Sequence, residues 1–245
     1  FGFLKDAKIT DLTQIEGNIA EKNIDEENFR QILEIQLPEN SKQNVLKVIK
    51  QLEKIPGVKY AGPDYVLEEP VTAAPSAANA SVMRASTPDP DISVDGTWAL
   101  RKINAYKAWK ITEGSYDVKV GIIDSGISAH PELTRTTNAA LGKDFYESSS
   151  SVPNPDVDPN TATDDIVGHG TTVAGVIGAT GNNTYGSRGI NKRVTMIPLQ
   201  VYSPEKYTPI ATISLIIEAI TYAINQNIPI LNVSAGSATY SEAYK

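Results

Sequence analysis

Short apolar runs alternate with longer ones along the second half of the chain. Residues 118–123, 195–201 and 228–233 are nearly continuous apolar runs of strand length, typical of strands buried on both faces of a sheet. Residues 171–177 and 213–225 have the pattern and length of helices. Strands that alternate with helices predict right-handed crossovers and a mainly parallel sheet, so we expect an α/β fold here.

The first 70 residues predict a separate, smaller α+β unit. Residues 31–37 alternate partly between apolar and polar positions and stop at Pro38, which indicates a strand. Residues 41–52 begin with a serine and carry apolar residues at helical spacing, with lysines on the other face. Pro56 and Gly57 end this helix, and residues 58–61 predict another strand. A unit of this size is only marginally stable by itself.

Residues 71–92 have a different character. Small residues and prolines dominate this stretch, and no periodicity survives in it. Such a segment predicts an exposed linker that proteases reach readily. The chain therefore divides into a unit of residues 1–70, a linker of residues 71–92 and a larger α/β domain of residues 93–245.

Composition excludes several classes of function. The 245 residues carry a net charge of -7, which argues against nucleic acid as the natural partner. No apolar run approaches the length of a membrane span. The chain has no cysteine, so it can form neither disulfides nor a thiolate metal site.

Two residues stand in settings that suit a buried catalytic pair. Asp124 ends the apolar run of residues 118–123 and precedes a serine and a glycine, while His169 lies between two glycines and opens a helix. Taken alone, Asp124 is more simply a turn aspartate that bonds its own backbone. Taken alone, His169 is more simply a histidine at a helix start that bonds solvent or a neighbouring carbonyl. Together they predict an aspartate that orients a histidine, in the chain order of an Asp–His–Ser triad. Functional sites in parallel sheets lie at the carboxyl ends of the strands, where Asp124 falls.

At these motifs the chain resembles the subtilisin-like serine proteases. Residues 120–127 (VGIIDSGI) resemble the family's catalytic aspartate motif, and residues 168–175 (GHGTTVAG) its histidine motif. Thr172 departs from the pattern, since many members have a second histidine there. The resemblance covers roughly residues 95–236 and implies a subtilisin-like, mainly parallel sheet that is incomplete. The N-terminal unit resembles the family's inhibitory propeptide, which implies a small ferredoxin-like α+β domain.

The resemblance implies a secreted or cell-surface, bacterial-type serine endopeptidase zymogen. In it, His169 would act as general base and Asp124 would fix the imidazole. The propeptide would inhibit the cleft until cleavage within residues 68–91. Substrates would be peptides or proteins, held by segments that resemble the family's pocket and edge strand: Ser234, Ala235, Gly236, Pro209, Ile210 and Ala211. The last three are equally a plain loop that leads into a helix.

No serine of these 245 residues stands in the nucleophile setting of the family, and the oxyanion asparagine is not matched either. We therefore expect the chain alone to be inactive and the C-terminal half of the catalytic domain to be a partner. The alternative is a non-catalytic binding or inhibitory module built on an incomplete protease fold.

The triad chemistry implied by the resemblance needs no cofactor. Related enzymes bind a structural Ca²⁺ through an acidic residue and a loop, which correspond here to Glu132, Asn182 and Asn183. Oxygen ligands of this type suit Ca²⁺. The same residues equally form an ordinary turn.

Overall fold

The computed structural model describes residues 2–17, 22, 24, 29–68, 98–146, 165–181, 183, 186, 188–203 and 209–236. The predicted linker lies outside these residues, as does Asn182. The protein is a mixed α/β structure with a parallel sheet of four strands, as expected. Its strands are β1 (Lys8–Asp11), β2 (Leu33–Gln36), β3 (Val66–Glu68), β4 (Gly114–Asp124), β5 (Lys143–Asp144), β6 (Arg193–Gln200), β7 (Ile210–Thr212) and β8 (Ile230–Val233). Its α-helices are α1 (Lys42–Leu52), α2 (Trp98–Lys102), α3 (Ala105–Ala108), α5 (His169–Gly178) and α6 (Ile213–Asn225).

The parallel sheet has the strand order β5-β6-β4-β8. Asp124 at the end of β4 is in register with Gln200 at the end of β6, and Ile123 with Val233 of β8. The carboxyl ends of these three strands therefore meet at one edge of the sheet, where sites form in this class of fold.

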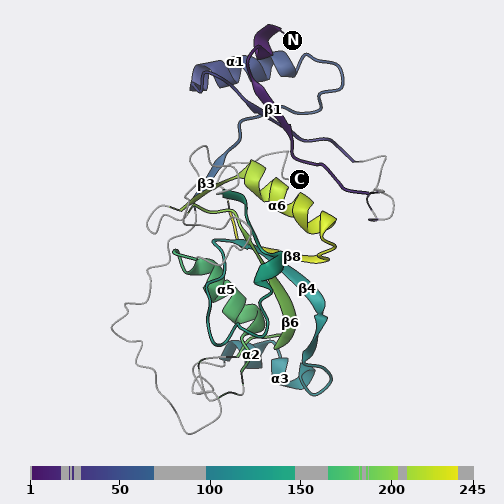
Figure 1. Cartoon of the computed structure of the whole chain (residues 1–245), viewed down its shortest axis with the longest axis vertical. Coiled ribbons are helices and arrows are strands. Elements are labelled where there is room, and N and C mark those ends of the chain that lie inside the picture. The colour runs from purple at the N-terminus through teal and green to yellow at the C-terminus, as the bar shows by residue number, and fades with distance from the viewer. Residues whose placement is uncertain are drawn as a thin grey trace.

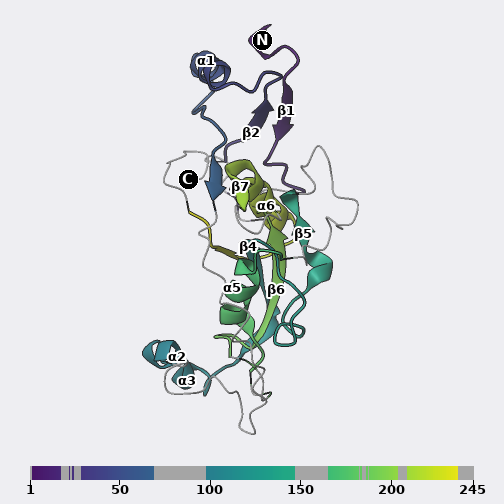
Figure 2. The same cartoon turned by 90° about the vertical axis from the view of Figure 1, so that its left-hand side faces the viewer.

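The two faces of the sheet are covered by different helices. Val120 and Ile122 of β4 pack with Ala174 of α5, whereas Ile123 belongs to the cluster built with α6. Because successive side chains of a strand point to opposite faces, α5 and α6 cover opposite sides. This double coverage explains why the buried C-terminal parts of the two strands, residues 120–123 of β4 and 196–199 of β6, lack polar side chains. Figure 2 shows α5 beside the sheet.

The strands of the N-terminal unit differ in part from those that the sequence predicts. The unit contains a two-stranded antiparallel sheet of β1 and β2, and the helix α1. Ser41 caps the first turn of α1 by accepting the N–H of Asn44. The prediction of a strand at residues 58–61 is wrong: these residues are irregular. They follow Gly57, which has a positive φ of 94°, and precede Gly62 and Pro63, so no ladder continues through them. The described residues thus do not confirm a ferredoxin-like domain.

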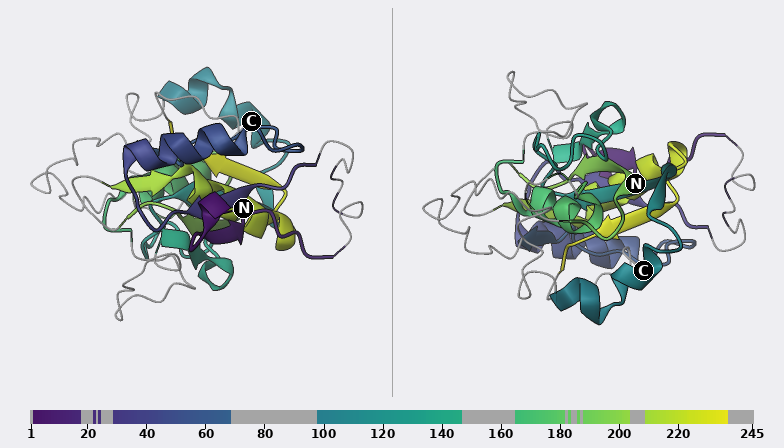
Figure 3. Two further views of the ribbon diagram at one scale, coloured as in Figure 1. Left: turned by 90° about the horizontal axis from the view of Figure 1, so that it is seen from above. Right: turned by 90° about the horizontal axis from the view of Figure 1, so that it is seen from below.

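The N-terminal unit is docked on α6. Instead of joining β1 and β2, β3 pairs antiparallel with β7, with Leu67 opposite Ala211. Asp64 accepts the N–H of Ser214 at 3.1 Å and its hydroxyl at 2.5 Å, near the start of α6. Farther along the helix, the Thr221 hydroxyl donates to the carbonyl of Leu12 at 2.8 Å. From above, the unit covers the end of the molecule that carries α6, while α2 and α3 lie at the opposite end (Figures 1 and 3).

Candidate active site

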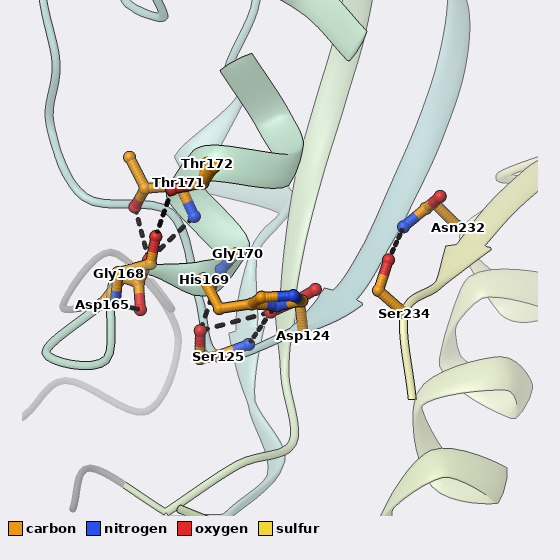
Figure 4. A network of polar contacts seen from close by, with 10 residues as sticks. All are labelled: Asp124, Ser125, Asp165, Gly168, His169, Gly170, Thr171, Thr172, Asn232 and Ser234. Atoms are coloured by element: carbon orange, nitrogen blue, oxygen red, sulfur yellow. Dashed lines mark hydrogen bonds and ion pairs between the residues drawn. The ribbon is translucent and has the colours of Figure 1, made fainter. Parts of the chain in front are cut away.

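Asp124 and His169 meet at the carboxyl end of the sheet. Asp124 is fully buried at the end of β4, and His169 is the first residue of α5, with 21% of its side chain exposed. His169 Nδ1 lies 2.9 Å from Asp124 Oδ1 (Figure 4). With Asp124 ionised, Nδ1 is the donor, which makes Nε2 the basic nitrogen of the neutral ring. The structure therefore brings together the two residues that the sequence analysis paired.

One oxygen of Asp124 receives all the hydrogen bonds. Asp124 Oδ1 accepts the N–H of Ser125 at 2.8 Å and its hydroxyl at 3.2 Å, besides its contact with His169. Oδ2 is buried without a hydrogen-bond partner among the described residues. Burial raises the pKa of Asp124, because it disfavours the charged form, and the bonds from His169 and Ser125 oppose this rise.

The glycines on either side of His169 serve different purposes. A Cβ on Gly170 would lie 2.2 Å from the carbonyl oxygen of Gly126, so only glycine lets α5 approach the turn after β4. Gly168 has open space around it, but its φ of 89° lies in the left-handed region. At Gly168 the backbone conformation, and not a close contact, is therefore what requires glycine.

The expected substrate segments lie at two places near this edge. Ser234, Ala235 and Gly236 follow β8, and the Ser234 hydroxyl accepts a hydrogen bond from Asn232 Nδ2 at 2.7 Å (Figure 4). Pro209 is buried just before β7, while Ile210 and Ala211 belong to that strand. β7 pairs with β3, an extended segment of the same chain.

The loop expected to bind metal closes on Glu132. This carboxylate is 3% exposed and accepts the side-chain N–H of Asn183 at 2.6 Å and the N–H of Gly181 at 3.3 Å. The described residues contain no group of three or more histidine, aspartate and glutamate side chains that could hold a metal. In the described residues, which do not include Asn182, the Glu132 oxygens accept N–H groups rather than lying beside further oxygen ligands of the kind that Ca²⁺ prefers, and Ca²⁺ at this loop stays a prediction.

Sequence reasoning missed two polar residues of this region. Ser125 bonds Asp124 and also accepts the N–H of Gly170 at 3.0 Å. Its place directly after the aspartate was the available signal. Asp64, which bonds Ser214, could not be found from the sequence because 150 residues separate the two.

Comparison with known proteins agrees with this geometry. The profile of the Subtilase family matches residues 115–245. Subtilisin E of Bacillus subtilis is 30% identical over 81% of this chain and 42% of its own length. Halolysin of Haloferax mediterranei is 31% identical over 57% of this chain and 25% of its own length. The crystal structure of fervidolysin from Fervidobacterium pennivorans matches 92% of this chain and 34% of that chain, with a TM-score of 0.60 and 19% identity.

The chain thus spans between a quarter and less than half of the length of these proteins. The fervidolysin match shows a shared fold, and the family profile covers more than half of the chain, including both Asp124 and His169.

Proposed function

Because the chain belongs to the subtilase family of serine peptidases, we propose that it forms part of an endopeptidase that hydrolyses peptide bonds with an Asp–His–Ser triad. The observation that carries this proposal is the 2.9 Å contact between His169 Nδ1 and Asp124 Oδ1. In this reaction His169 Nε2 takes the proton of the serine hydroxyl as the serine attacks the peptide carbonyl. The same nitrogen then returns the proton to the leaving amine.

Asp124 contributes by holding the imidazole. Its carboxylate accepts Nδ1–H, which selects the required tautomer and stabilises the imidazolium that forms during attack. Ser125 keeps the carboxylate oriented through two hydrogen bonds to the same oxygen. Because Asp124 is fully buried, this electrostatic contribution is larger than it would be at a surface.

The nucleophilic serine and the oxyanion asparagine come, in this proposal, from polypeptide beyond these 245 residues. β8, the strand next to β4, is an edge of the sheet in the described part of the chain, and its Ile230 is 48% exposed. An apolar edge of this kind favours pairing with a further strand. We expect the 245-residue chain to self-associate through this edge, or to bind a polypeptide that supplies the further strand. Light scattering after size exclusion would then give a molar mass above that of one chain. A monodisperse monomer would contradict this part of the proposal.

The N-terminal unit acts, in this proposal, as an intramolecular inhibitor. Extended substrates of peptidases add a strand to an exposed edge, and β3 occupies the edge of β7 in that manner. Asp64 anchors this segment at the start of α6. Maturation then requires cleavage after β3, within residues 68–91. N-terminal sequencing of the mature protein would locate the cleavage and would exclude maturation if residues 1–68 stay attached.

No cofactor enters this mechanism. The triad chemistry assigns no step to a metal. A relative of the chain is the minor extracellular protease Epr of Bacillus subtilis, 29% identical over 67% of this chain. We propose that the whole protein likewise acts outside the cell, on peptide or protein substrates. None of the helices in the described residues is long and apolar enough to cross a membrane.

A fluorophosphonate probe, which labels only an activated serine, tests the proposal. A longer form of the protein that carries the serine should be labelled, and its His169→Ala variant should not. The 245-residue chain should not be labelled either. Labelling of this chain would contradict the claim that the serine lies elsewhere. A folded, mature longer form that resists the probe would favour a non-catalytic binding module.

A further inference from the structure

The first turn of α5 is held by side chains that do not belong to the helix. A helix leaves its first N–H groups without partners inside the helix, and a side chain at the N-cap position commonly accepts one of them. The N-cap residue of α5 is Gly168, which has no side chain to offer. The N–H of Gly170 is accepted by Ser125, and that of Thr171 by Asp165 at 2.8 Å.

Both carboxylate oxygens of Asp165 are used at this turn. Asp165 Oδ1 accepts the N–H of Gly168 at 2.8 Å, while Oδ2 accepts the N–H of Thr171 and its hydroxyl, the latter at 2.5 Å. Asp165 is only 7% exposed, so water competes little for these bonds. Its negative charge also lies at the positive end of the helix dipole, which favours the arrangement further. The bonds enclose His169, which lies between Gly168 and Thr171 in the sequence.

The same residue is connected to the turn that follows β4. The backbone N–H of Asp165 donates to the Ser128 hydroxyl at 3.1 Å. The N–H of Ser128 in turn donates to the Thr171 hydroxyl at 3.0 Å. Ser128 follows Asp124 by four residues. Asp165, Thr171 and Ser128 thus join the segment that carries the base to the segment that carries its partner (Figure 4 shows the first two).

We propose that Asp165 is a positioning residue of the catalytic pair: it fixes the first turn of α5 against the turn after β4, and so keeps the His169 ring in contact with Asp124. This inference rests on the proposed function, in which His169 is the general base. A displacement of a catalytic group by about 1 Å can cost on the order of 100-fold in rate. Asp165 acts on the pair through its hydrogen bonds with Gly168, Thr171 and Ser128.

Proton NMR of the imidazole tests the inference without any need for catalysis. The chain has only two histidines, so ¹⁵N-histidine labelling gives only two sets of ring signals. The set that disappears in a His130→Gln variant belongs to His130 and serves as an internal reference. In the wild type, the Nδ1–H bonded to Asp124 should give a downfield resonance. A His169 Nδ1–H resonance observed at the position of a solvent-exposed imidazole would show that the pair is not formed, and would overturn the proposed function together with this inference.

Two variants remove the hydrogen bond between the Asp165 carboxylate and the Thr171 hydroxyl, and two variants preserve it. Asp165→Ala and Thr171→Val should shift the His169 Nδ1–H resonance upfield or lose it through exchange with water. Thr171→Ser keeps the hydroxyl and should retain the resonance. Thr172→Val is the matched control, because Thr172 lies in the same turn but is exposed and donates only to the Gly168 carbonyl.

A purely structural cap would give a different result. In that case Asp165→Ala would lower Tm, by about 2–4 °C for each kcal/mol lost, while the folded protein would keep the resonance unchanged. That outcome overturns the inference. Should Asp165→Ala fail to fold, Thr171→Val decides, since it nearly preserves side-chain volume and leaves the carboxylate in place. Retention of the resonance in folded Thr171→Val would equally overturn the inference.

Discussion

Asp124 contacts His169 at 2.9 Å from a fully buried position, and this burial makes the charged carboxylate useful for function but unfavourable for stability. Because burial raises the pKa of Asp124 in the folded protein, its contribution to stability is fully present below the unfolded pKa. It is lost as the pH rises through the folded pKa. The ionised carboxylate that the mechanism needs therefore destabilises the fold near neutral pH.

Replacing this carboxylate by an amide should separate the two effects. Asp124→Asn should raise the free energy of unfolding at pH 7 and leave it nearly unchanged near pH 3, measured by urea unfolding. In a longer form that carries the serine, the same change should lower kcat by about 10⁴-fold, a size known from triad variants of trypsin and subtilisin. Asp117→Asn on the exposed part of β4 is the control. Equal stability changes for both variants at pH 7 would contradict the argument.

Gly170 and Gly175 offer a matched test of the contact between α5 and the turn after β4. A Cβ on Gly170 would lie 2.2 Å from a backbone carbonyl, whereas one on Gly175 would meet nothing within 4 Å. Gly170→Ala should destabilise the protein by about 1–3 kcal/mol, as overpacking does. Gly175→Ala should stabilise it by up to about 1 kcal/mol through helix propensity. Thermal unfolding of the two variants checks the prediction, which a tolerated alanine at position 170 would refute.

Carboxylates gather where the N-terminal unit meets α6. The pKa of Glu218 is raised by burial and then by Glu34, with Asp64 adding to the rise and Lys143 and Lys8 opposing it. The pKa of Glu34 is raised by burial and by Asp64, and lowered by Lys8. For groups with raised pKa values, stability is lost as the pH rises through the folded pKa. The docked form should therefore be more stable in mildly acidic solution than near neutral pH.

Glu218→Gln should weaken this pH dependence. We expect the variant to unfold at a higher temperature than the wild type at pH 7.5, and at nearly the same temperature at pH 4. Glu53→Gln, an exposed change just after α1, is the control and should have no such effect. A Glu218→Gln variant that is destabilised at pH 7.5 would show that the carboxylate is held by favourable contacts instead.

Calcium should have little effect on stability. The Glu132 carboxylate already accepts N–H groups from Asn183 and Gly181. A calcium concentration 100-fold above Kd would add about 2.7 kcal/mol, which for a chain of this size raises Tm by roughly 5–11 °C. We expect Tm values in calcium chloride and in EDTA to agree closely. A rise of the calculated size would establish a metal site at this loop.

Local patterns predicted most of the parallel sheet and its helices. α6 begins and ends as its apolar helical run indicates, and Thr212 caps it by accepting the N–H of Leu215. The C-terminal half of β4 is recognisable because both of its faces are buried, whereas its exposed first half was not predicted. Asp124 and His169 could be paired from the sequence because small residues flank both of them.

Long-range contacts could not be predicted in the same way. Val66–Glu68 forms a strand because it pairs with β7. Residues 58–61 have a better local strand pattern, but they do not pair with any described strand. β1 and β5 are too short for their periodicity to be informative. The different roles of Gly168 and Gly170 also depend on the tertiary surroundings, since both glycines look alike beside His169.

The central claim is that His169, held by Asp124, is the base of a peptide-cleaving triad. The most direct measurement is the hydrolysis of an extended peptide by a longer, matured form of the protein that carries the serine, compared with its His169→Ala variant. The account predicts cleavage by the first and a loss of kcat of several orders of magnitude in the second. A folded, matured protein that cleaves no peptide while His169 is intact, or a His169→Ala variant of undiminished activity, would contradict it.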